Sequence, residues 1–214
     1  MGNPKAGSGV EAATKIEDAD IALSETVSAE RKNPWVKALG TLGDMGDQPQ
    51  LATLSACTLA FGLISGRPRV AIAGANMLLS FGVATAMKAA IKKTVSRTRP
   101  SLMLDEGTYA VEPLGPDEGA WHSFPSGHTA GSVAVARALA RSCPEAALPA
   151  YAAAALIAGI QLPTAHHFAS DIVAGAAIGF AADALVERAT RLVLETLTEP
   201  PEPDELGEAA PKRG

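Results

Sequence analysis

The sequence predicts an all-α protein, a helical bundle of about five transmembrane helices embedded in a membrane. Three observations lead to this prediction. Five apolar stretches alternate with more polar segments, as expected for helices that pack side by side. Alanine and glycine are abundant in these stretches, and small residues allow helices to approach closely in lipid. The mean hydropathy is only mildly positive because polar residues gather at both ends of the chain.

The lengths of the five stretches decide which of them can cross a bilayer. They comprise residues 51–66, 70–91, 127–139, 146–162 and 172–197. The second has about 22 residues and would rise roughly 33 Å as a helix, enough to cross the hydrocarbon core. The shorter stretches also fit buried helices of a soluble bundle. We favour membrane insertion because of the length of the second stretch.

The two ends of the chain differ in character from this apolar middle. Residues 10–33 mix charged and apolar side chains in the pattern of an amphipathic surface helix, which cannot span a membrane. The C-terminal end is rich in proline and glutamate, a composition typical of disorder. We therefore expect an amphipathic or flexible segment over residues 1–33, one domain over residues 34–197, and a disordered tail over residues 198–214.

The first group of chemically informative residues follows the second apolar stretch, with six residues between Lys92 and Arg99. Arginine offers a planar fork that holds two phosphate oxygens, and lysine supplies a compact charge. Pro100 restricts Arg99 to an extended backbone, which directs its side chain away from the preceding helix. The same cations would also fit a collar of basic side chains at a membrane edge. This segment alone leaves both interpretations open.

The second group is the tetrapeptide Pro125-Ser126-Gly127-His128. Ser126 is a natural N-cap, and Gly127 lets backbone N–H groups at a helix start approach an anion. A phosphate there would meet the positive end of the helix dipole. His128, on the first turn, would point into the same space. An ordinary serine-capped helix after a proline turn explains the tetrapeptide equally well when it is considered alone.

The third group pairs His167 with Asp171, four residues later. This spacing puts both side chains on one face if the last helix begins there. The carboxylate could then accept a proton from one imidazole nitrogen and leave the other free to attack a substrate. Asp171 could instead merely cap the last helix. We expect His122 and His166 to be loop residues or substrate contacts rather than catalysts.

The order of the three groups along the chain gives an independent argument for a shared site. The first follows the second apolar stretch, the second opens the third stretch, and the third lies between the fourth and fifth. Helices that cross in turn place all three groups on the same face of the bundle. We therefore expect the cations, the helix start and the histidines to form one site.

In this order and spacing the groups resemble the type 2 phosphatidic acid phosphatase (PAP2) superfamily, whose pattern is K-x6-R-P, P-S-G-H and S-R-x5-H-x3-D. The resemblance covers about residues 34–195 and implies the helical core shared with haloperoxidases. It implies that His167 is the nucleophile, forming a phosphohistidine, and that His128 protonates the leaving oxygen. Imidazole suits both roles because its pKa lies near neutrality. The resemblance also implies a reaction without a metal.

One position departs from the pattern, because Ile160-Gln161 stands where the family has Ser-Arg. The family resemblance implies that side chain 161 contacts the phosphate. A neutral amide can donate hydrogen bonds, but a charge-assisted bond is about twice as strong. The predicted phosphate-binding residues are therefore Lys92, Arg99, Ser126, Gly127 and Gln161.

These patterns predict an integral-membrane lipid phosphatase that needs no cofactor and binds no metal, because the four histidines lack cysteine partners and zinc-ligand spacings. Its substrate would be phosphatidic acid, phosphatidylglycerol phosphate or a polyprenyl diphosphate, among surrounding membrane lipids. The net charge of −5 argues against a nucleic-acid partner. The oligomeric state is not indicated by the sequence. Alternatives are a soluble acid phosphatase or haloperoxidase of the same superfamily, and a non-catalytic protein that binds lipid phosphates.

Arginine positions suggest how the protein would lie in a bacterial-type inner membrane. Five arginines gather on the face opposite the three groups: Arg67, Arg69, Arg141, Arg188 and Arg191. The positive-inside rule then puts the site on the extracytoplasmic face.

Overall fold

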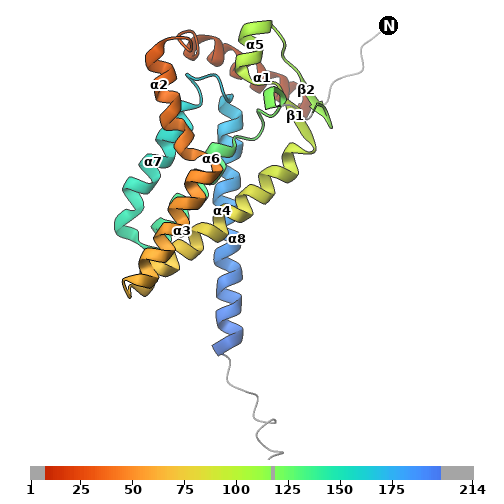
Figure 1. Cartoon of the computed structure of the whole chain (residues 1–214). Coiled ribbons are helices and arrows are strands. Elements are labelled where there is room, and N and C mark those ends of the chain that lie inside the picture. Colours follow the sequence, from red (N-terminus) through yellow and green to blue (C-terminus); the bar gives the residue numbers. More distant parts are fainter. Residues whose placement is uncertain (1–7, 117–118, 199–214) are drawn as a thin grey trace, which may run out of the picture.

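The computed structural model describes residues 8–116 and 119–198, and its architecture is a helical bundle with one small β-hairpin (Figure 1). The long helices of this part of the chain are α1 (Ser8–Val27), α2 (Pro34–Gly43), α3 (Gln48–Ile64), α4 (Pro68–Lys92), α6 (Gly127–Ser142), α7 (Ala147–Ile160) and α8 (Ala169–Thr198). Shorter elements are η1 (Asp44–Gly46), α5 (Pro100–Glu106), η2 (Gly119–Trp121) and η3 (Pro144–Ala146). The predicted disordered tail lies outside the described residues, apart from Thr198 at the end of α8.

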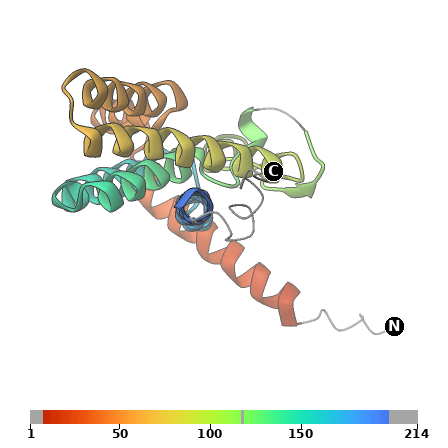
Figure 2. The same ribbon diagram turned by 90° about the horizontal axis from the view of Figure 1, so that it is seen from below.

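Helices α4, α6 and α8 pack against one another at the centre of the bundle. Helix α3 packs on α4, α7 packs on α6, and α2 contacts α7, so the outer helices flank this central group (Figures 1 and 2). The lower part of α8 extends beyond the other helices (Figure 1). The buried core is built largely from small side chains, such as Ala84, Ala130, Ala134 and Ala182. Helix α6 is therefore held on several sides, which fixes the position of its first turn.

Close contact between α6 and α8 depends on two glycines one helical turn apart. A Cβ added at Gly175 would lie 2.5 Å from the carbonyl oxygen of Ser126, and one at Gly179 would lie 2.7 Å from that of Ala130. Real side chains do not tolerate such distances, so larger residues would push the two helices apart. Small residues at these positions therefore allow α6 and α8 to pack closely. It brings the start of α8 directly against the start of α6.

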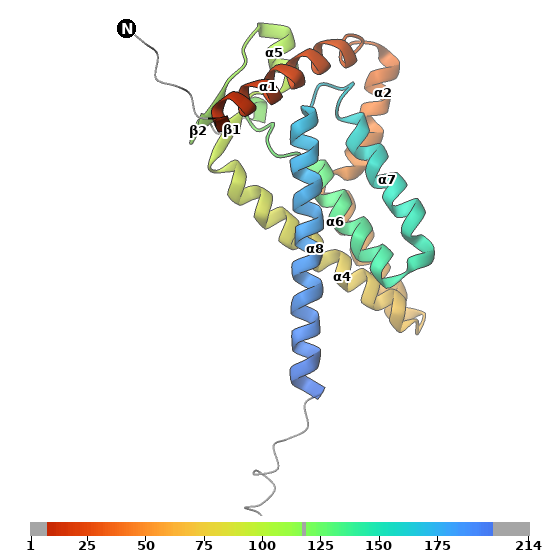
Figure 3. The ribbon, with the colours of Figure 1, turned by 180° about the vertical axis from the view of Figure 1, so that it is seen from behind.

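One end of the bundle is covered by α1, α5 and a hairpin formed by β1 (Val95–Arg97) and β2 (Val111–Pro113) (Figures 1 and 3). The amphipathic pattern of residues 10–33 corresponds to α1, but this helix docks through polar side chains. Asp20, Ser24 and Ser28 are buried, whereas Ile16 and Leu23 are exposed. Helix α1 is thus attached to the bundle by hydrogen bonds rather than by an apolar face.

Two helices of the described chain are long and apolar enough to cross a membrane, over Pro68–Lys92 and Ala169–Leu197. The apolar helix over Pro144–Ile160 is shorter. The mostly helical fold therefore agrees with the sequence, while the number of five transmembrane helices stays a prediction. Helix α2 and the hairpin were not predicted, because their short segments carry no long apolar run.

Candidate active site

Five of the eight predicted site residues line one small pocket of about 120 Å³. They are Lys92, Arg99, Gly127, His128 and His167. The pocket lies where the end of α4, the start of α6 and the loop before α8 meet, with the turn between α2 and α3 closing another side. The structure thus places parts of all three groups around one cavity, as the alternation of helices along the chain predicts.

The cations Lys92 and Arg99 reach the pocket from the end of α4 and the start of α5. Arg99 is the extended residue before Pro100, which opens α5. Its guanidinium makes no hydrogen bond with the described residues, and its Nε is buried without a partner. Lys92 donates from Nζ to the carbonyl oxygen of His122. A half-buried guanidinium without an acceptor among the described residues is costly unless an anion binds there, so this arrangement indicates an anion site.

The first turn of α6 supplies the backbone side of the pocket. Ser126 is fully buried and caps the helix, because its Oγ accepts a hydrogen bond from the Thr129 N–H at 3.4 Å. Its side chain does not line the pocket, whereas the next residue, Gly127, does. Ser126 thus acts as the predicted N-cap, and its predicted contact with phosphate stays a prediction. The helix start itself favours a bound anion.

The orientation of His167 is set by the carbonyl oxygen of Ser123, 2.7 Å from its Nδ1. A carbonyl can only accept, so Nδ1 carries the proton and Nε2 keeps a free lone pair. Burial lowers the pKa of His167 to about 4, so the imidazole is neutral at physiological pH. A neutral, oriented imidazole beside two cations is suited to attack an electrophilic phosphorus atom.

Asp171 supports His167 less directly than the sequence predicts. Its Oδ2 lies 3.8 Å from His167 Nδ1, longer than a hydrogen bond. The same oxygen accepts from the Ser123 hydroxyl at 2.6 Å and from the Phe168 N–H at 2.8 Å. Asp171 therefore fixes Ser123 and the loop before α8, and Ser123 in turn holds the imidazole.

A buried ionic chain connects Asp171 to the N-terminal helix. Arg97 donates to Asp171 at 2.8 Å and to Asp20 at 2.9 Å. Asp20 also accepts from the Ser170 backbone N–H at 3.0 Å and from the hydroxyl of the same residue. The Arg97 guanidinium lies over the Phe168 ring, 4.0 Å from its centroid. Arg97 is thus a support of the site, whereas Arg99, two residues later, belongs to the pocket.

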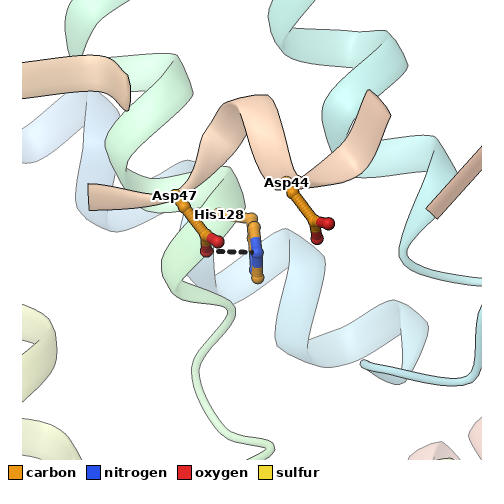
Figure 4. Close-up of side chains that lie close together, drawn as sticks. All are labelled: Asp44, Asp47 and His128. Carbon is orange, nitrogen blue, oxygen red and sulfur yellow. Dashed lines mark ion pairs between the residues drawn. The ribbon is translucent and has the colours of Figure 1, made fainter. Parts of the chain in front are cut away.

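The second histidine, His128, lies across the pocket from His167, with 6.0 Å between the ring centroids. Its Nε2 is 2.8 Å from Asp47 Oδ1, and Asp44 lies on the same turn of chain (Figure 4). Burial lowers the pKa of His128, and the neighbouring Asp47 carboxylate opposes this shift by favouring the protonated imidazole, the form needed for an acid. Ligand atoms of Asp44, Asp47 and His128 lie within 4.8 Å of one another, so this group could also hold a metal ion.

Gln161 lies away from the pocket. Its side chain is almost completely buried, and Nε2 donates to the Ile157 carbonyl oxygen at 3.1 Å. Its backbone oxygen accepts from the N–H groups of His166 and His167, which shapes the loop before α8. The predicted contact of Gln161 with phosphate stays a prediction, since the side chain is not among those that line the cavity.

Sequence reasoning missed five residues of the site, namely Gly46, Asp47, Gln48, Lys88 and Ser123. The first four line the pocket, and Ser123 orients His167. Lys88 carried a usable signal, because it is the one charge between Arg69 and Lys92 and lies one turn before Lys92. Asp47 and Ser123 belong to turns, where no periodic pattern indicates the direction of a side chain.

Comparisons with known proteins agree with this geometry. The PAP2 superfamily model matches residues 73–192. The fold is similar to the crystal structure of Aquifex aeolicus LpxE, with a TM-score of 0.60, 23% identity, and coverage of 78% of this chain and 93% of that chain. It is also similar to the crystal structure of the first transmembrane PAP2 type phosphatidylglycerolphosphate phosphatase from Bacillus subtilis, with a TM-score of 0.61, 22% identity, and coverage of 84% and 88%. No curated protein sequence matches significantly. The matched region holds most of the pocket, and the chain belongs to the PAP2 superfamily.

Proposed function

We propose that this PAP2-type phosphatase hydrolyses a phosphomonoester or diphosphate carried by a membrane lipid, through a phosphohistidine intermediate. The observation that carries the proposal is a neutral, oriented imidazole in the same pocket as Arg99, whose guanidinium has no acceptor among the described residues. The imidazole provides a nucleophile, and the cations provide the positive charge that binds the phosphate group of the substrate. The candidate substrates are phosphatidic acid, phosphatidylglycerol phosphate and a polyprenyl diphosphate.

The first half of the reaction forms a bond between His167 and phosphorus. Nε2 of His167 attacks, and the bond from phosphorus to the lipid oxygen breaks. The leaving oxygen takes a proton from His128, whose ring is held in place by Asp47. Lys92, Arg99 and the N–H groups at the start of α6 bind the phosphate oxygens as charge builds on them. His167 then carries a phosphoryl group, and the lipid alcohol departs.

The second half of the reaction releases phosphate. A water molecule attacks phosphorus on the opposite side from Nε2, and His128, now neutral, accepts its proton. The bond from phosphorus to Nε2 breaks, and the imidazole returns to its neutral state. Both protein groups regain their starting protonation states, so the cycle is balanced without a cofactor.

Exposed apolar faces favour a lipid substrate over a soluble ester. Large apolar side chains on α3, α4, α7 and α8 are exposed in the monomer, including Phe61, Ile72, Leu156 and Val173. Such faces suit contact with lipid tails. The two similar crystal structures are named as LpxE and a transmembrane phosphatidylglycerolphosphate phosphatase. We propose an inner-membrane location with the site on the extracytoplasmic face.

The proposal is tested by assaying purified protein, in detergent, for phosphate release from the three lipid classes, with and without EDTA. We expect turnover of at least one lipid and full activity in EDTA, because side-chain cations do the work that a metal would do. Anion binding without any turnover would favour the non-catalytic alternative. Loss of activity in EDTA that one divalent cation restores would instead assign Asp44, Asp47 and His128 as a metal site.

A further inference from the structure

A third cation lines the pocket beside Lys92 and Arg99, and the three sequence groups do not include it. This cation is Lys88, on the face of α4 that also carries Lys92. It is the only charged residue between Arg69 and Lys92 in an apolar helix. A charge in such a segment is costly in lipid and usually faces a polar cavity or a partner.

The Lys88 ammonium reaches the first turn of α6. A Cβ added at Gly127 would lie 2.7 Å from Nζ of Lys88, and the Cδ and Cε atoms would lie 3.4 and 3.6 Å away. The glycine therefore leaves room for this lysine at the point where the N–H groups of α6 begin. Within the described part of the chain, Nζ forms no hydrogen bond or ion pair. Lys92, by contrast, already donates to His122.

Position 161 does not supply a positive charge to the pocket. The side chain there is a neutral amide, 1% exposed, with Nε2 bound to Ile157. Its Oε1 has no hydrogen-bond partner among the described residues. A site that must hold a phosphate group therefore draws its cations from α4 and from the segment before α5, rather than from the end of α7.

We infer that Lys88 is a phosphate-binding residue, whose ammonium replaces the positive charge that is missing at position 161. The inference rests on the proposed function and deepens it. Three cations surround the pocket, whereas Asp47, which also lines it, is 48% exposed and already binds His128. The pocket therefore carries an excess of positive charge, which suits a phosphate anion. Gly127 has a second role here, because any larger residue would displace the ammonium from the helix start.

The test measures binding of orthovanadate and inorganic phosphate to the full-length protein by isothermal titration calorimetry, which does not depend on turnover. Lys88→Met should weaken binding by about tenfold to a hundredfold, the worth of one charged hydrogen bond. Lys88→Arg should retain most of the affinity. Lys93→Met is the matched control, because Lys93 is exposed and does not line the pocket. It should bind both anions like the wild type.

A second variant keeps the charge of Lys88 but fills the space that Gly127 leaves for its ammonium group. Gly127→Ala should weaken vanadate binding while Lys88 remains in place, because the new methyl group would overlap Nζ. The inference is overturned if Lys88→Met binds vanadate within twofold of the wild type while Arg99→Met loses binding. Wild-type affinity in Gly127→Ala would also count against it. These results leave the proposed function intact, whereas failure of the wild type to hydrolyse any lipid phosphate would reject that function separately.

Discussion

Helix α8 carries two fully buried aspartates, one beside each end of α6, and the cations around them are organised differently. Asp183 accepts hydrogen bonds from Arg137 at 3.0 Å, from Arg141 at 2.9 Å and from Ser80 at 2.8 Å. Glu187 lies 3.4 Å from Arg137 and adds a second carboxylate. Each charge in this cluster has an opposite partner, and the cluster joins α4, α6 and α8.

Near the start of α6, the cations outnumber the carboxylates that bind them. Asp171 and Asp20 both form ion pairs with Arg97, so the charge of that arginine is matched. Arg99 and Lys88 have no hydrogen-bonded carboxylate among the described residues, and they line the pocket. The excess of positive charge is therefore local, although the whole chain is acidic.

The difference shows how α8 can contribute both to helix packing, through Asp183, and to the candidate active site, through Asp171. Buried ion pairs contribute to the arrangement of helices when every charge is matched. Half-buried cations without carboxylate partners, such as Lys88 and Arg99, destabilise the protein until an anion binds them. The predictions below break or sharpen this contrast, starting with the largest expected effect.

His167→Ala removes the nucleophile and should lower turnover of the lipid phosphate by at least about 10⁴-fold, since the other imidazole of the pocket, His128, is placed to act as the acid. Rapid-quench experiments with labelled substrate should show no phosphoenzyme. The thermal unfolding midpoint is the control, and it should remain near wild type. Full activity in this variant would reject the mechanism.

Asp183→Ala breaks the paired cluster and should lower the free energy of unfolding by about 3–5 kcal/mol, because it leaves two arginines without their buried partner. Turnover per folded molecule should stay near wild type. Unfolding in detergent gives the first quantity, and activity at a temperature well below the midpoint gives the second. The matched control is Asp105→Ala, which removes exposed ion pairs to Arg31 and Lys32 and should cost less than about 1 kcal/mol.

Asp20→Asn weakens the connection from α1 to the site and should lower kcat by about tenfold with little change in KM. Asp20 touches no pocket atom, so it acts through Arg97 and Ser170 on the placement of Asp171. Steady-state kinetics separate kcat from KM. Asp18→Asn, an exposed change on the same helix, serves as control. A rise in KM with unchanged kcat would show that α1 influences substrate binding instead.

The pKa of His167 tests whether its imidazole is buried and neutral, because an exposed histidine would have an ordinary pKa. Burial lowers its pKa to about 4, so its ring should stay neutral as the pH falls from 7 to about 5 and become charged only below that range. Nuclear magnetic resonance of protein with ¹⁵N-labelled histidine measures this pKa, and His167→Ala identifies the signal by its loss. A value near 6.5, that of a free imidazole, would contradict the buried, neutral arrangement.

Gln161→Arg should have the smallest effect of the series. The sequence pattern predicts tighter inhibition by vanadate, but the wild-type side chain lies outside the pocket and binds Ile157. We therefore expect vanadate affinity to rise by no more than about threefold, well below the change produced by a charged bond in the pocket. A tenfold increase would show that side chain 161 reaches the anion, and it would weaken the assignment of Lys88 as the replacement.

Long helices could be predicted from sequence because their signal is repeated over many residues. The apolar stretch over residues 70–91 corresponds to Pro68–Lys92, and that over residues 127–139 to Gly127–Ser142. Short elements such as α2 and the hairpin lack such a repeat. Helix α1 was predicted, but its docking side was not, because its buried residues are polar and their partners lie on α8 and in the loop before it.

The sequence by itself determined the local features of this protein: the apolar helices, the Ser126 cap at the start of α6, and the order of the motifs that brings cations and histidines to one face. The first two depend on residues close together in the chain, and the third depends only on the order of helices and motifs along it. Only the tertiary structure decided that Lys88 and Asp47 line the pocket, that Ser123 rather than Asp171 binds His167, and that Gln161 turns away. The physical reason is that these contacts join segments distant in sequence, and helix packing sets which side chains meet.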